Sequence, residues 1–193
     1  LWENCPGCQT ITGSGNGFES ASTGISGSIT RFSIIGERLY VVDGFRLLPF
    51  TISNPQELSS APAIPLTRQV ETLFPYNNYL FMGTTTGMQI YGTGNPDLPV
   101  EISTITHATA CDPVVVQGNY AYITTRMGTT CAGNINQLDV IDISAISNPV
   151  TVASYPMFNP HGLGIDGNRL FICDGSAGLK VFNTSNPVDC GNE

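Results

Sequence analysis

Charged residues are scarce in this sequence. Asp, Glu, Lys and Arg make up 11% of the 193 residues, well below the usual quarter or so. Amphipathic helices need charged outer faces, and no window of three or four turns has apolar residues at helical spacing. A mainly helical protein is therefore excluded. Gly and Pro are abundant, with 21 and 13 copies, which favours short strands joined by many turns.

Positive charge is scarcer still. Seven Lys and Arg residues are scattered singly, and the formal net charge is −8. Nucleic acid and anionic lipid are both bound by clustered positive charge, so we expect no nucleic-acid partner. No apolar run approaches the roughly 18 residues of a membrane span, so we also expect no transmembrane segment in this chain.

Catalytic motifs are missing as well. The sequence has no Gly-x-Ser-x-Gly nucleophile elbow, no phosphate-binding loop and no paired metal motif, and it has only two His residues. A non-enzymatic protein without a cofactor is favoured for this reason.

One pattern recurs four times at a period of about 40 to 50 residues. Each unit has an apolar strand, a turn at Gly or Asn, and a second strand anchored by an aromatic residue. The second strands are Arg38–Gly44, Tyr79–Gly83, Tyr120–Thr124 and Arg169–Gly175, in which Tyr40, Phe81, Tyr122 and Phe171 occupy the same position.

A third strand follows in the units, and it leads to an Asn-Pro pair. Third strands are predicted at Gly87–Tyr91, Gln137–Asp142 and Gly178–Phe182, and the pairs begin at Asn54, Asn95, Asn148 and Asn186. Because proline lacks a backbone donor, each pair indicates a turn outside the sheet. Outer strands then begin at Val100 and Val150.

Four antiparallel strands repeated in this way predict an all-β fold of the β-propeller type. A β-sandwich also has short strands and turns, but it does not predict recurrence of the same four-part unit. We expect residues 1–26 to form a Cys-containing and Gly/Ser-rich N-terminal segment. The repeats are expected at about 27–67, 68–109, 110–157 and 158–193, the last one incomplete. A propeller closes to remove its edges, so the four repeats are expected to be part of a seven- or eight-bladed ring.

The units resemble the LVIVD-repeat family of extracytoplasmic β-propellers, best known from surface and outer-membrane proteins of Bacteroidetes-type bacteria. The resemblance covers about residues 27–188. It is clearest in Cys111–Val116, Asn148–Pro149, Asn159–Asp166 and Phe171–Phe182. It implies an extracytoplasmic location at the cell surface or outer membrane of a Gram-negative bacterium, with a lipid anchor upstream of Leu1 left open.

Overlaying the units puts Thr30, Glu71, Asp112 and His161 at one equivalent position near the start of each first strand. That strand lines the central channel of a propeller, so these side chains are candidate ligands at a channel mouth. Glu71, Asp112 and His161 could hold Ca²⁺ or another divalent metal. The alternative is that these polar groups bind water and each other.

The longest connection between a second and a third strand, Arg126–Asn136, belongs to the third unit. Cys111 starts the first strand of that unit and Cys131 lies in the loop, so we predict a disulfide between them that holds the loop. Arg126 and Asn134 are candidate binding residues on this face. The partners of Cys5, Cys8, Cys173 and Cys190 are left open.

Two hypotheses of function follow. The first is a cell-surface binding or assembly scaffold that presents a propeller face to a protein partner of the cell envelope or to a glycan. The second is a metal-dependent hydrolase or lactonase-like enzyme with its site at the propeller axis. Propellers host both kinds of protein, so the fold alone does not decide between them.

Overall fold

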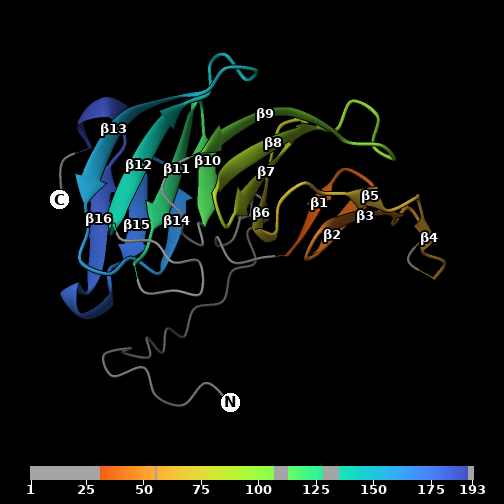
Figure 1. Ribbon diagram of the computed structural model, residues 1–193, viewed down its shortest axis with the longest axis horizontal. Helices are drawn as coiled ribbons and strands as arrows, with labels where there is room; N and C mark the ends of the chain where they lie inside the picture. The colour runs from red at the N-terminus through yellow and green to blue at the C-terminus, as the bar shows by residue number, and fades with distance from the viewer. Residues whose placement is uncertain (1–30, 55, 107–112, 128–134, 191–193) are drawn as a thin grey trace, which may run out of the picture.

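The computed structural model describes residues 31–54, 56–106, 113–127 and 135–190. These residues form four antiparallel sheets that follow one another in chain order, from β1 at the right of Figure 1 to β16 at the left. No helix in these ranges is long and apolar enough to cross a membrane. The helical residues there belong to two short 3₁₀ turns, Gly175–Ala177 and Pro187–Asp189.

Each sheet is one propeller blade. The first contains β1 (Phe32–Ile35), β2 (Arg38–Asp43), β3 (Arg46–Thr51), β4 (Ser59–Ser60) and β5 (Ile64–Pro65), the last two both paired with β3. The second contains β6 (Val70–Tyr76), β7 (Tyr79–Thr84), β8 (Gly87–Gly92) and β9 (Val100–Thr106). The third contains β10 (Val114–Gln117), β11 (Tyr120–Thr125), β12 (Gln137–Asp142) and β13 (Val150–Pro156), and the fourth contains β14 (Gly162–Asp166), β15 (Arg169–Cys173) and β16 (Leu179–Asn183). The predicted all-β fold and the order of strands within each repeat are confirmed.

The aromatic positions of the second strands are equivalent in the sheets. Tyr40, Phe81, Tyr122 and Phe171 each pair with the third position before the turn on the first strand. The first three side chains are fully buried, whereas that of Phe171 is only half-buried. The burial of these large rings between blades is a main source of the hydrophobic core.

Two-residue turns join the first and second strands. Gly118 has a φ of 58° and Asn77 has a φ of 52°, values that Gly and Asn tolerate better than other residues. Such turns place the strands in tight register, so the apolar alternation of the sequence becomes two apolar faces on each blade.

Hydrogen bonds connect neighbouring blades as well as apolar contacts. The Tyr40 hydroxyl donates to the Pro96 carbonyl oxygen at 3.0 Å, and the Gly118 amide donates to the Tyr76 hydroxyl at 2.8 Å. The first strands β1, β6, β10 and β14 lie next to one another. This is the arrangement of blades around a propeller axis.

At the two ends of the row of blades, apolar side chains are exposed whose equivalents in the other blades are buried. Leu179 on β16 is 63% exposed, although the equivalent Leu47, Met88 and Leu138 are all 0% exposed. On the first blade, Phe32 is 59% exposed. In the other blades the equivalent positions are buried against a neighbouring blade, and the two end faces have no neighbouring blade among the described residues.

Candidate functional site

Antiparallel blades place their connections on two opposite faces. We call one the loop face: it carries the connections between second and third strands and those leading from one blade to the next. Its described residues are 44–45, 66–69, 85–86, 126–127, 135–136, 157–161 and 174–178. The opposite face, the turn face, carries the two-residue turns and the Asn-Pro connections.

Two of the four predicted channel-mouth residues are described: His161 lies on the loop face, and Glu71 is the second residue of β6, next to that face. Glu71 and His161 each precede by three residues the first-strand position that pairs with the aromatic of the second strand. The Glu71 carboxylate forms an ion pair with Arg31, with 2.7 Å between Nη2 and Oε2, and it accepts a hydrogen bond from Gln69. This carboxylate already has a cationic partner.

A metal centre is not assembled by the described residues. In residues 31–54, 56–106, 113–127 and 135–190, no three His, Cys, Asp or Glu side chains are close enough to hold a metal ion together. Thr30 and Asp112 lie outside these ranges. The metal site therefore stays a prediction from the sequence.

His161 has polar neighbours from two loops. Its Nε2 atom is 3.5 Å from Arg126 Nη1 and 3.3 Å from Asn159 Nδ2. A guanidinium can only donate, so a hydrogen bond with Arg126 requires Nε2 of His161 to be the acceptor. The structure thus brings together two residues that the sequence singled out separately, Arg126 and His161.

The Asn136 side chain fixes the loop that carries Arg126. Its Oδ1 accepts a hydrogen bond of 2.7 Å from the Met127 amide, and its Nδ2 donates to the Phe158 carbonyl oxygen at 2.5 Å. The Met157 amide donates to the Asn136 carbonyl oxygen at 2.9 Å. One residue thereby joins the β11–β12 connection of the third blade to the segment that enters the fourth.

A buried carboxylate holds that entering segment from the other side. Asp174 is fully buried, accepts hydrogen bonds from the amides of Phe158 and Asn159, and forms an ion pair of 2.7 Å with Lys180. Burial alone raises the pKa of Asp174, but the hydrogen bonds from Lys180 and the two amides outweigh burial and lower that pKa below its usual value. Asp174 is therefore ionised near neutral pH, and it fixes the backbone beside His161.

Large apolar side chains remain exposed above this fixed backbone. Phe158 is 60% exposed, and Met127 and Ile135 are also exposed. We call these three residues, together with Arg126, Asn159 and His161, the loop patch. Sequence reasoning found only the two polar residues Arg126 and His161, because a lone Phe or Met in a connection carries no pattern.

The cysteine predictions are resolved only in part. Cys111, Cys131 and Asn134 lie outside the described residues, as do Cys5 and Cys8. Cys173 is exposed at the end of β15, and Cys190 is buried with a free thiol. Burial raises the pKa of the Cys190 thiol, and the nearby Asp189 carboxylate raises it further, so this thiol is less reactive than an exposed one.

The arrangement of the blades defines the class of this protein as a β-propeller. The model of the LVIVD repeat family matches residues 109–156, which contain β10 to β13. A search of curated proteins found no match.

Solved structures share the fold at very low sequence identity. A chain of the S. cerevisiae assembly of Dbp5 bound to Nup159, Gle1, IP6 and ADP matches with a TM-score of 0.60 and 8% identity, over 86% of this chain and 43% of that chain. The N-terminal domain of Nup159 matches with a TM-score of 0.59 and 9% identity, again over 86% and 43%. The present chain thus spans less than half the length of these two structures, and the likeness concerns the fold alone.

Proposed function

We propose that this propeller is a non-enzymatic binding scaffold that docks a protein partner on the loop patch. The observation that carries the proposal is the exposure of Phe158 and Met127 beside Arg126 on a backbone fixed by hydrogen bonds. Aromatic residues, Met and Arg are enriched at protein interfaces and in their energetic centres. A surface that is already ordered also loses less entropy on binding.

The fold is consistent with this role. Propellers offer a rigid face on which connections from several blades meet. The similar Nup159 domain comes from a protein that is bound in an assembly with Dbp5 and Gle1. We carry over from that assembly only the idea of a protein partner.

The location of the protein is part of the proposal. The LVIVD repeat and the six cysteines support an extracytoplasmic protein of the cell surface or outer membrane, with its partner in the cell envelope. A photo-crosslinking experiment on the protein in its native envelope tests both statements. One photoreactive residue replaces Phe158 on the loop patch, and in a matched control another replaces Leu98, which is 54% exposed on the turn face.

The expected result is one stoichiometric adduct from position 158, found in the envelope fraction. The photoreactive residue at position 98 should not form this adduct. Adding Arg126→Ala to the Phe158 reporter should reduce the yield of that adduct. Equal labelling from both positions, or no adduct from position 158, would show that the loop patch is not a docking site.

A further inference from the structure

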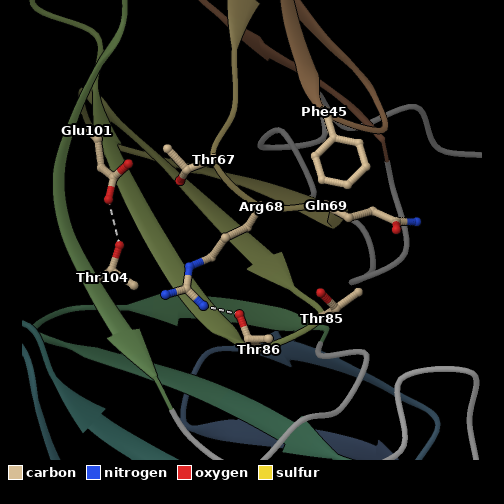
Figure 2. A pocket seen from close by; sticks show the side chains of 8 residues that line it. All are labelled: Phe45, Thr67, Arg68, Gln69, Thr85, Thr86, Glu101 and Thr104. Carbon is tan, nitrogen blue, oxygen red and sulfur yellow. Dashed lines mark hydrogen bonds between the residues drawn. The ribbon is translucent and has the colours of Figure 1, made fainter.

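A second feature of the loop face lies between the first and second blades, away from the loop patch. It is a pocket of about 670 Å³ whose lining is mostly polar (Figure 2). Its walls come from the β2–β3 turn, the segment entering β6, the β7–β8 turn and strand β9. The lining residues are Phe45, Thr67, Arg68, Gln69, Thr85, Thr86, Glu101 and Thr104. Pockets of this volume hold small molecules.

Arg68 is the cation of this pocket. It donates one hydrogen bond to the Thr86 hydroxyl, and no carboxylate of the described residues forms an ion pair with it. By contrast, Arg31, Arg38 and Arg46 each have a carboxylate partner. Arg68 is half-buried as a residue, and its guanidinium retains donors whose planar geometry matches a carboxylate.

Hydroxyl and amide groups surround the guanidinium, and two of them are held by hydrogen bonds to neighbouring side chains. The Thr67 hydroxyl accepts a hydrogen bond of 3.0 Å from the fully buried Gln89 side chain, so its own proton is available to a ligand. Gln69 donates to Glu71 through its nitrogen, at 2.9 Å, which leaves its carbonyl oxygen as an acceptor. These groups suit a ligand that carries several hydroxyls.

An aromatic ring completes the pocket. Phe45 is 55% exposed at the tip of the β2–β3 turn, where Gly44 has a φ of 58°, and its ring stands at the edge of the pocket in Figure 2. A flat apolar surface beside hydroxyl-binding groups matches a sugar ring, which has C–H groups on its face and hydroxyls around its edge.

The acidic residue of the pocket is engaged within the protein. Glu101 accepts hydrogen bonds from the Tyr91 hydroxyl at 3.2 Å and from the Thr104 hydroxyl at 2.7 Å. Both Glu101 oxygens thus have hydroxyl donors from their own blade, whereas the Arg68 guanidinium retains donors for a ligand. We propose that this pocket binds a carboxylated sugar, with the sugar carboxylate on Arg68 and the ring against Phe45.

Isothermal titration of the full chain tests this proposal. The probes are D-glucuronate, neutral D-glucose, acetate and a tetraglutamate peptide. Glucuronate should bind saturably and about tenfold more tightly than glucose, because only glucuronate offers a charged acceptor to the guanidinium. Acetate and the peptide should bind more weakly than glucuronate because neither has a ring with hydroxyls.

Two variants separate the contributions of charge and stacking. Arg68→Gln should lower the affinity for glucuronate to that for glucose and leave glucose binding unchanged. Phe45→Ala should weaken both sugars by a similar factor. Arg38→Gln removes the same charge from a residue that pairs with Asp97 away from the pocket, and it should change neither affinity.

Tight binding of the peptide without glucuronate, equal affinities for glucuronate and glucose, or no binding of either sugar would each overturn the proposal. Matching circular dichroism spectra for the variants show that a lost affinity is not a loss of folding. Protein docking on the loop patch is unaffected by failure here, because the two sites share no residue.

Discussion

Truncation of one leucine in each of two blades tests whether the repeats are equivalent and what covers them. Leu138 on β12 and Leu179 on β16 occupy the same third-strand position, yet the first is 0% exposed and the second 63% exposed. Leu138→Ala removes a fully buried side chain and leaves a cavity, so the free energy of unfolding should fall by about 3 kcal/mol. Leu179→Ala loses only about a third of the burial of a leucine and leaves no cavity, so its cost should be about 0.7 kcal/mol.

Urea denaturation followed by circular dichroism measures both values. The midpoints should separate clearly while the slopes stay equal, because neither change alters the surface exposed on unfolding. Equal costs for the two variants would refute the assignment of an uncovered end face to the fourth blade. In a longer protein that supplies the next blade, Leu179→Ala should cost as much as Leu138→Ala, because the same position would then be buried between blades.

Three further outcomes are expected. Gly87→Ala should destabilise the protein by about 3 kcal/mol in the same urea assay, because a Cβ there would lie 2.0 Å from a backbone oxygen of β9 and φ is 139°. The control is Gly164→Ala, which has no atom within 4 Å of the new Cβ and should change stability by less than about 0.5 kcal/mol. Asp174→Asn should lower the free energy of unfolding at pH 7 by about 2 kcal/mol, because it leaves Lys180 without its anion. Because the pKa of Asp174 is lowered on folding, the stability that its carboxylate contributes is present above about pH 4 and is lost as the pH falls further. In thermal melts at a series of pH values, the stability of the variant should therefore fall less steeply with acid than that of the original protein. Burial, and after it the Glu101 carboxylate, raises the pKa of Tyr91 to about 12. The stability that this hydroxyl contributes should be present below pH 10 and decline up to about pH 12. Tyr91→Phe should remove one late-titrating tyrosine from the ultraviolet absorbance titration.

Local patterns in the sequence predicted much of the fold. Strand alternation, turn residues and the Asn-Pro pairs act over a few residues each, and their recurrence predicts the same register for Tyr40, Phe81 and Tyr122. The pairing of strands confirmed this register. Local rules are sufficient because an antiparallel blade is built from hairpins between neighbouring segments.

Prediction of the candidate sites was less complete. His161 was chosen from its position in the repeat and Arg126 from its place in the longest loop, and the structure shows them in contact. Phe158, which dominates the exposed surface beside them, was missed because its exposure depends on how two blades meet. The pocket around Arg68 was also missed, since its lining residues come from separate connections and follow no motif spacing.

The sequence by itself determined the all-β class, the four repeats and the strand register, because these follow from alternation and turn chemistry within each unit. Only the tertiary structure decided which equivalent side chains are covered: Leu138 and Leu179 have the same place in their repeats, and the presence of a neighbouring blade makes one core and the other surface. It also decided which charges are neutralised, pairing Glu71 with Arg31 and leaving the Arg68 guanidinium facing a pocket. Burial and ion pairing depend on segments distant in the chain, and the pattern within one repeat carries no information about them.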